Sequence, residues 1–214
     1  MTAKHPLIEA TINRLGLHAA ELYDQLIYTV IDAATNEYRP NSRAADTDLI
    51  GSDHITYNDL IELDALLVAQ GARPFGGSEY VLITSPQPYA AMAKDPNFLA
   101  SHQLASPEKI WRGEVDKLGG FRIVRSNAPG FAVTSQAGSG DADKVYSSFA
   151  LGMNAFQIID LQNLEMNVVA PGGHSDVLKQ SYKLGYKFMF KSLITNQNWI
   201  RRVRSAGLDS VSNP

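Results

Sequence analysis

The stretch that decides the fold spans residues 8–35, IEATINRLGLHAAELYDQLIYTVIDAAT. Its apolar residues recur at steps of three and four, the spacing of one helix face. They are Leu15, Ala19, Leu22, Leu26, Val30 and Ala33. A continuous helix here would be about 42 Å long, which exceeds the usual length in globular proteins. We therefore expect a spine helix that lies across another long element, rather than a helix buried in a compact core.

The residues that follow predict a polar loop or linker over 36–55 and then a second helix. Thr56 is a good N-cap with Asp59 three residues later, and Gly71 follows the last apolar residue. Leu60, Leu63 and Leu67 form the expected buried stripe of this second helix.

Strand signals dominate the rest of the chain. Short apolar runs predict strands over 80–84, 121–124, 131–134, 145–151 and 166–169, with a short helix over 88–94. The clearest strand spans 182–191, where Tyr, Leu and Phe alternate with lysine, glycine and methionine. We expect residues 196–198 to turn this strand into a terminal hairpin with 199–204. The chain is thus predicted to be α+β.

Charge is distributed unevenly along a chain with a net charge of -3. Residues 179–214 hold seven basic residues and one acid, whereas the preceding part is acidic. A basic segment on an acidic body indicates an anionic neighbour, either nucleic acid or another copy of the chain. A solvated strand face is the alternative. The absence of cysteine excludes disulfides, thiolate catalysis and cysteine-bound zinc.

No motif carries a complete catalytic, cofactor or metal site, so we predict none of the three. His18 and Glu21 supply only two ligands, and the calcium-loop spacing of Asp46, Asp48 and Gly51 lacks its later oxygen ligands. Two alternatives to a structural role stay open. One is a small α/β enzyme with a site built from His174, Asp176 and Asp160, and the other is a nucleic-acid-binding module using residues 179–204.

The order of short motifs from residue 57 onward resembles the major capsid proteins of tailed phages, in particular the coat-protein family of N-four-like podophages. The motifs are Tyr57-x-Asp59-Leu60, Gly76-Gly77-x-x-Tyr80, Asp95-Pro96, Trp111-x-Gly113, Gly119-Gly120-Phe121, Ile159-Asp160-Leu161, Gly172-Gly173 and Trp199-Ile200-x-Arg202. That family has the Hong Kong ninety-seven type capsid fold. Its members carry an N-terminal arm and an extended two-stranded loop before the spine helix. Met1 falls almost at that helix, so the expectation is either that this chain is a fragment or that both parts are missing or supplied otherwise.

The resemblance implies a spine helix, a peripheral β-hairpin and a compact α/β axial domain. We place the spine helix and linker in residues 1–55, the axial domain mainly in 56–178, and a basic hairpin and tail in 179–214. The implied function is that of a non-enzymatic subunit of an icosahedral shell, which assembles with its own copies into hexamers and pentamers around packaged double-stranded DNA.

The resemblance also implies partners and a location. DNA would touch the inner face weakly and without sequence specificity, portal or decoration proteins are further partners, and no membrane is involved. The protein would reside in the virion capsid, and in the host cytoplasm during assembly. Six residues of the basic segment are our candidates for an assembly interface: Lys183, Lys187, Lys191, Trp199, Arg202 and Arg204.

Overall fold

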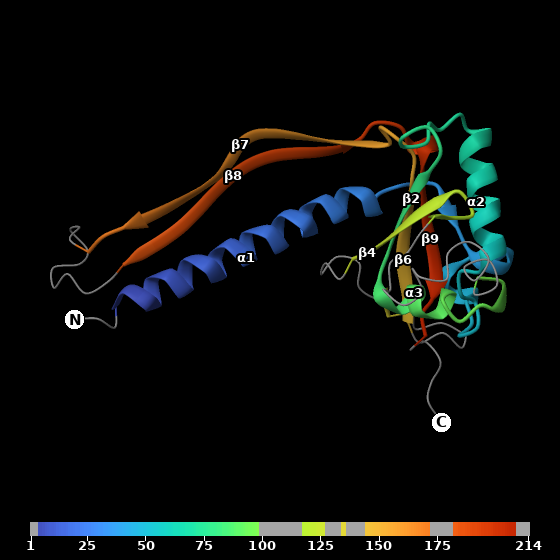
Figure 1. The fold of residues 1–214 in the computed structure, drawn as a ribbon, viewed down its shortest axis with the longest axis horizontal. Helices are drawn as coiled ribbons and strands as arrows, with labels where there is room; N and C mark the ends of the chain where they lie inside the picture. The colour runs from blue at the N-terminus through green and yellow to red at the C-terminus, as the bar shows by residue number, and fades with distance from the viewer. Residues whose placement is uncertain (1–3, 99–116, 127–133, 136–143, 172–181, 209–214) are drawn as a thin grey trace, which may run out of the picture.

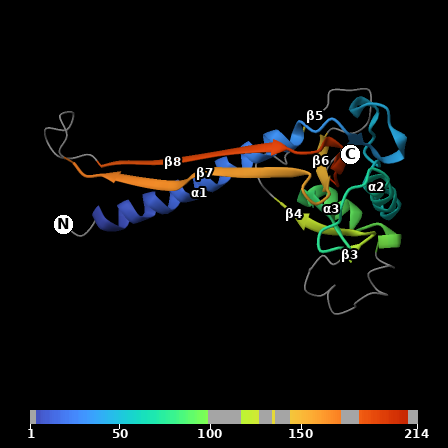
Figure 2. The same cartoon turned by 90° about the horizontal axis from the view of Figure 1, so that it is seen from above.

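The predicted spine helix is present as α1 (Lys4–Asp32), a single helix of 29 residues. The computed structural model describes residues 4–98, 117–126, 134–135, 144–171 and 182–208. For most of its length α1 lies beside a long antiparallel hairpin of β7 (Phe156–Val169) and β8 (Lys183–Ile194) (Figures 1 and 2). Helix and hairpin together form an arm that projects from an α/β lobe, so the expected long partner of the helix is this hairpin.

The lobe is built on a mixed sheet whose strand order is β1-β9-β6-β2-β4-β3, with β5 also paired to β6. The β1–β9 and β2–β4 pairs are parallel and the other described pairs are antiparallel. In chain order these strands are β1 (Glu37–Tyr38), β2 (Tyr80–Thr84), β3 (Lys117–Leu118), β4 (Phe121–Arg125), β5 (Thr134–Ser135), β6 (Lys144–Leu151) and β9 (Ile200–Ala206).

One face of the sheet is covered by α2 (Tyr57–Ala69). Its start is the predicted one, because the Thr56 hydroxyl accepts a hydrogen bond from the Asp59 backbone and Asp59 bonds back to Thr56. The buried stripe Leu60, Leu63 and Leu67 packs on sheet residues that include Leu82 and Phe121. The short helix α3 (Pro86–Met92) follows β2 and adds Met92 to the same core.

On the opposite face of the sheet, the end of α1 and the residues just after it cover β6 and β9. Ile31 and Ala34 pack there against Phe149, Leu151 and Ile200. The ring of Tyr28 meets that of Phe149 edge-on at 5.6 Å, a favourable aromatic geometry. The helix therefore belongs to the lobe at one end and to the arm along the remainder.

The predicted terminal hairpin is wrong. β8 pairs with β7, and β9 pairs with β6 inside the lobe. The intervening residues form a 3₁₀ turn, η4 (Gln197–Trp199), in which the Asn196 side chain accepts a hydrogen bond from the Asn198 backbone. This turn redirects the chain into the sheet instead of reversing it. Most of the strand predicted over 131–134 lies outside the described residues.

The stretch predicted as a loop or linker, residues 36–55, is fixed to the lobe, and we call it the strap. It contains β1 and two 3₁₀ turns, η1 (Pro40–Ser42) and η2 (Asp46–Asp48). The fully buried Asp53 carboxylate accepts hydrogen bonds from Asn41, Arg43 and the Ile50 backbone. Burial alone would raise the pKa of Asp53, but these donors outweigh it and lower the pKa below its usual value. The strap is therefore held by an ionised carboxylate.

Asp53→Asn should destabilise the lobe in a pH-dependent way. A carboxyl with a lowered folded-state pKa contributes stability above its unfolded pKa, and that contribution is lost as the pH falls through the folded pKa. We expect the substitution to lower the free energy of unfolding by about 1–3 kcal/mol at pH 7, because the amide group of asparagine would place its own NH₂ donor against groups that already donate hydrogen bonds. Below about pH 4 the difference from wild type should shrink. Urea unfolding at both pH values measures this.

The control is Asp24→Asn, because Asp24 is exposed on α1. Its unfolding free energy should follow that of the wild type at both pH values. A loss in Asp53→Asn that stays the same in acid would contradict the role assigned to the carboxylate charge.

Candidate assembly surface

The alternating pattern of β8 is confirmed, and it divides the strand into a helix-facing side and an outward side. The half-buried residues are Leu184, Tyr186, Phe188 and Phe190, whereas Lys183, Lys187 and Lys191 are exposed. On the helix side, the ring of Tyr23 lies 4.3 Å from that of Phe190 and 6.1 Å from that of Phe188. The hairpin is thus held on α1 by aromatic contacts.

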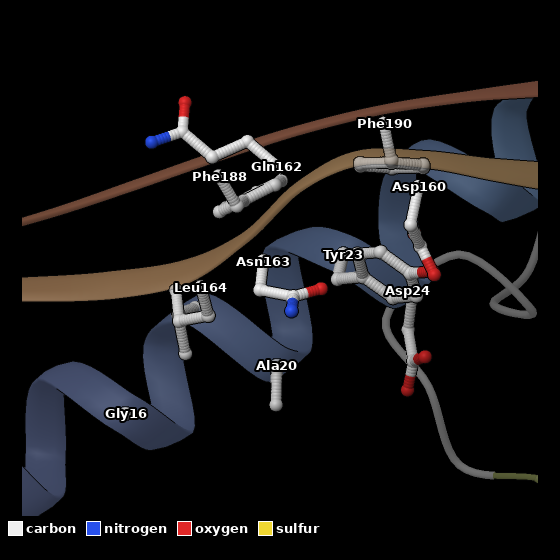
Figure 3. A pocket seen from close by; sticks show the side chains of 11 residues that line it. Gly16, Ala20, Tyr23, Asp24, Asp160, Gln162, Asn163, Leu164, Phe188 and Phe190 are labelled. Atoms are coloured by element: carbon white, nitrogen blue, oxygen red, sulfur yellow. The ribbon is translucent and has the colours of Figure 1, made fainter.

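A cleft of about 320 Å³ opens between α1 and the hairpin beside this aromatic contact (Figure 3). Small residues, Gly16 and Ala20, line its helix side. On the strand side the register of β7 shifts between Asp160 and Gln162 and again before Glu165, so the strand is bulged there. The cleft is where the bulged strand and the small helix residues leave space.

The polar groups of the cleft serve to hold β7. The Tyr23 hydroxyl donates to the Asp160 carboxylate at 3.3 Å. Burial and the neighbouring carboxylate raise the pKa of Tyr23 above its ordinary value, which keeps the hydroxyl protonated and donating. Asp160 is therefore used in joining strand to helix. Its proposed enzymatic partners His174 and Asp176 lie outside the described residues.

The outward side of the hairpin combines three lysines with exposed apolar side chains. Lys187 lies opposite Glu165, and Lys191 lies opposite Ile159. The apolar residues exposed on the hairpin include Ile159, Leu161, Val169 and Met189. Within the described part of the chain, both outer edges of the hairpin lack a partner strand. Long free edges with apolar neighbours are typical of surfaces that associate.

The six predicted interface residues do not share one surface. Lys183, Lys187 and Lys191 lie on the hairpin, whereas the other three lie within the lobe. The indole of Trp199 donates to the Gln70 carbonyl at 3.3 Å, and Arg204 is only 8% exposed. The structure therefore divides the six between the hairpin and the lobe, because β8 and β9 belong to different sheets.

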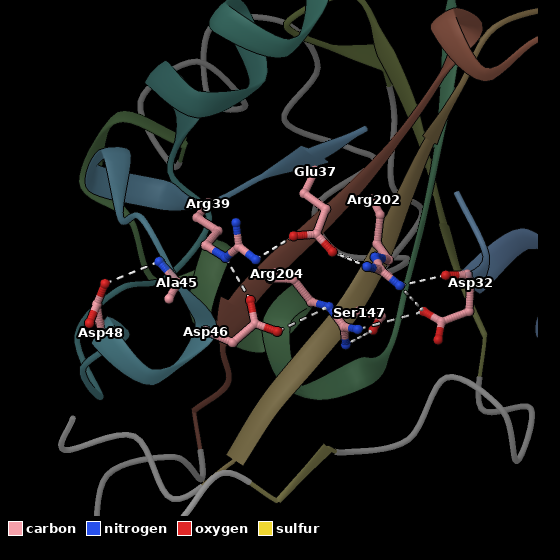
Figure 4. Close-up of polar contacts among 9 residues, drawn as sticks. All are labelled: Asp32, Glu37, Arg39, Ala45, Asp46, Asp48, Ser147, Arg202 and Arg204. Atoms are coloured by element: carbon pink, nitrogen blue, oxygen red, sulfur yellow. Dashed lines mark hydrogen bonds and ion pairs between the residues drawn. The ribbon is translucent and has the colours of Figure 1, made fainter. Parts of the chain in front are cut away.

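Arg202 instead holds the end of α1 to the sheet (Figure 4). Its guanidinium forms an ion pair with Glu37 of β1 and a second with Asp32, at 3.4 Å, in the last turn of α1. It also donates to the Asp32 carbonyl. One side chain therefore joins the helix end, β1 and β9, at the junction of arm and lobe.

The same cluster extends to the strap. Arg39 forms ion pairs with Glu37 and with Asp46, the latter at 2.6 Å. Arg204 donates to the Ser147 hydroxyl at 2.6 Å and lies 3.6 Å from Asp46 (Figure 4). Both oxygens of Asp46 thus face arginines, which leaves no place for the calcium loop considered above. The sequence offered no signal for this cluster, because its acids and arginines come from distant segments.

The remaining candidate ligands are also engaged or scattered. His18 Nδ1 lies 2.8 Å from the Tyr186 hydroxyl, so this histidine joins α1 to β8. Across the described residues, no three His, Cys, Asp or Glu side chains gather closely enough to hold a metal ion. None of the helices described here has the length and apolar character needed to cross a membrane.

Comparison with known proteins gives a fold but no sequence relative. No protein-family model and no curated protein matches the chain. Among solved structures, the capsid of Ralstonia phage GP4 is similar over 99% of this chain and 70% of that one, with a TM-score of 0.67 and 13% identity. The capsid of cyanophage P-SCSP1u matches 93% of this chain and 66% of its own, with a TM-score of 0.58 and 19% identity.

A third similar structure is the head of Helicobacter pylori bacteriophage KHP40, with a TM-score of 0.65 and 9% identity over 92% of this chain and 68% of that one. This chain thus spans about two thirds of the length of these capsid proteins. The predicted α+β fold of the Hong Kong ninety-seven type is confirmed, with its long helix, hairpin and α/β lobe.

Phe190→Ala should loosen the hairpin from α1 without disturbing the lobe. The substitution removes the ring nearest to Tyr23, so β8 loses part of its only described packing face. We expect amide hydrogen exchange in β8 to rise by about tenfold or more, while β6 exchanges as in wild type. Met189→Ala, which removes a neighbouring outward side chain, is the matched control and should change neither. Equal exchange in both variants would contradict this account.

Arg202→Leu should lower the free energy of unfolding by about 1–3 kcal/mol, because Asp32 and Glu37 lose the guanidinium between them. Arg201→Leu is the matched control. Arg201 forms no ion pair with a described residue, and burial lowers its pKa, so its loss should change stability by no more than about 0.5 kcal/mol. Guanidinium unfolding of both variants measures the difference, and equal losses would refute the role of the cluster.

Proposed function

We propose that this chain is a structural subunit of a phage or prophage capsid shell, which assembles with copies of itself into hexamers and pentamers around packaged double-stranded DNA. The observation that carries the proposal is the arm-and-lobe architecture. It superimposes on three phage capsid proteins over 92–99% of the chain. Similarity at such low identity establishes the fold, and the role in a shell is our inference from it.

The surface chemistry supports a role in association rather than catalysis. An arm with one packed side and one exposed apolar side is costly for an isolated molecule, since a two-stranded hairpin is marginally stable by itself. A lattice of identical copies would cover that side. The cleft beside α1 places its carboxylate and hydroxyl in a structural hydrogen bond, and we therefore propose a non-enzymatic protein.

The finer assignments rest on the resemblance in the sequence and remain predictions. They are membership of the N-four-like coat proteins, the domain limits at 55/56 and 178/179, and an axial role for the lobe. Weak DNA contact on the inner face, portal or decoration partners, and a virion location with host cytoplasm during assembly belong to the same proposal. The three hairpin lysines stay our candidates for an assembly contact.

Self-assembly is the direct test. The purified full chain, free of nucleic acid, should sediment as multi-subunit rings or shells above a critical concentration. Replacing Lys183, Lys187 and Lys191 by Glu should raise that concentration roughly tenfold, or about 1.4 kcal/mol per subunit contact. Lys94→Glu, at an exposed position outside the arm, is the control and should assemble normally. A chain that stays monomeric at every concentration would contradict the proposal.

The same lysines favour a second candidate function, binding of nucleic acid. Three exposed cations on one side of a strand could follow a phosphate backbone. A monomeric chain whose affinity for double-stranded DNA falls steeply with salt, and is lost in the triple Glu variant, would favour this module over the shell subunit.

A further inference from the structure

Helix α2 has two apolar sides, although only one of them is packed within the chain. Leu60, Leu63 and Leu67 are fully buried against the sheet. On the opposite side Ile61 is 47% exposed and Val68 is 58% exposed. Ala65 and Ala69 are exposed between and beside them, so a continuous stripe faces outward. Helices that are apolar all round are normally covered on all sides.

The charge of this helix has one sign. Its 13 residues include Asp59, Glu62 and Asp64 and no basic residue. Asp59 is buried as part of the cap, whereas Glu62 is exposed beside the stripe. The Tyr38 hydroxyl lies 2.8 Å from the Glu62 carboxylate and 2.7 Å from that of Asp59, and it shares its one proton between them. The outward stripe is therefore an apolar surface with an acidic border.

The opposite face of the same lobe carries a patch of matching character. Phe121 and Ile123 of β4 are buried toward α2, so Arg122 and Val124 between and after them point to the other face. Val81 of β2 is the register partner of Arg122 on that face. Val124 is 39% exposed, and Arg122 is exposed beside it.

A cleft of about 320 Å³ adjoins this patch. Phe75, Ser78, Glu79, Val81 and Arg122 are among the residues that line it. The side chain of Phe75 is 40% exposed there. The cleft has room for an aliphatic side chain of the size of isoleucine or valine, the two types that α2 presents.

We propose that the outward stripe of α2 docks onto the β2–β4 patch of a second copy of this chain. The stripe is Ile61, Ala65, Val68 and Ala69, and the patch is Val81, Arg122, Val124 and the adjoining cleft. The two surfaces match in apolar character, and Arg122 of the patch is opposite in charge to Glu62 at the border of the stripe. This inference rests on the proposed function, since it names the contact between neighbouring lobes of a shell.

The placement of the two surfaces determines the kind of assembly. They lie on opposite faces of one sheet, so each copy offers the stripe to one neighbour and the patch to another. Such a contact is heterologous and repeats until a ring closes. A copy with one damaged surface can still join one partner, but it cannot continue the ring.

That property gives a sharp test by complementation. The variant I61E/V68E lacks the stripe and keeps the patch, whereas R122E/V124E lacks the patch and keeps the stripe. In sedimentation velocity, neither variant should form rings alone. An equimolar mixture should form a complex of two copies at a concentration where each variant alone is monomeric. Lys94→Glu, at an exposed position outside both surfaces and outside the arm, is the control and should assemble like wild type.

A second measurement removes any dependence on charged substitutions. Because the chain has no cysteine, V68C/R122C introduces the only two thiols. Oxidation by diamide joins one thiol from each of two copies in a disulfide, with both thiols oxidised and diamide reduced. A heterologous contact should give a ladder of linked chains, whereas V68C or R122C alone should give no ladder.

The outcomes separate this inference from the proposed function. If the wild type forms shells and I61E/V68E still does so too, or if V68C/R122C gives no ladder of linked chains, the docking contact is overturned and the shell role is left intact. Rings that need both surfaces but never close into shells would support the contact and contradict the shell. A wild-type chain that is monomeric and does not cross-link would contradict both.

Discussion

The whole molecule depends on the packing of one helix against two different sheets. At its C-terminal end α1 places Ile31 and Tyr28 on the lobe, and along the remainder it places Tyr23 under the aromatic side of β8. A 29-residue helix of about 43 Å could not be stabilised along its length by the lobe alone. The hairpin packs on the lobe only at its base, through Phe156 and Ile194, and beyond that it has no other described packing partner. Helix and hairpin thus exist as an ordered arm only because each covers the other.

Electrostatics sets the direction of that arm. Arg202 is shared between Asp32 at the helix end and Glu37 on the sheet edge, and Arg39 connects the same sheet edge to the strap. Such half-buried pairs add little net stability compared with apolar burial, but a misplaced partner would leave a desolvated charge. The cluster therefore discourages other angles between arm and lobe. A defined angle is what a repeating lattice requires of its subunit.

Local patterns in the sequence were enough to predict α1, the Thr56 cap and the alternation of β8, because each depends on residues within a few positions. Strand partners depend on the whole chain, and a turn after Asn196 was therefore mistaken for a hairpin although β9 enters the lobe. The assembly candidates are divided between arm and lobe for the same reason: lysines on β8 and arginines on β9 are close in sequence but belong to different sheets. The junction cluster and the second apolar side of α2 were missed, since charged pairs from separate segments have no periodic signature and helix apolarity does not say which side is covered.

We propose that this chain is a subunit of a lattice, in which copies of the chain cover one another's exposed sides. Electron cryomicroscopy of the purified full chain, concentrated without nucleic acid, tests it most directly. We expect rings or closed shells in which every subunit keeps the arm-and-lobe shape. The outward hairpin side and the α2 stripe should be buried between neighbouring subunits. Dispersed single molecules, or particles in which both surfaces face solvent, would contradict it.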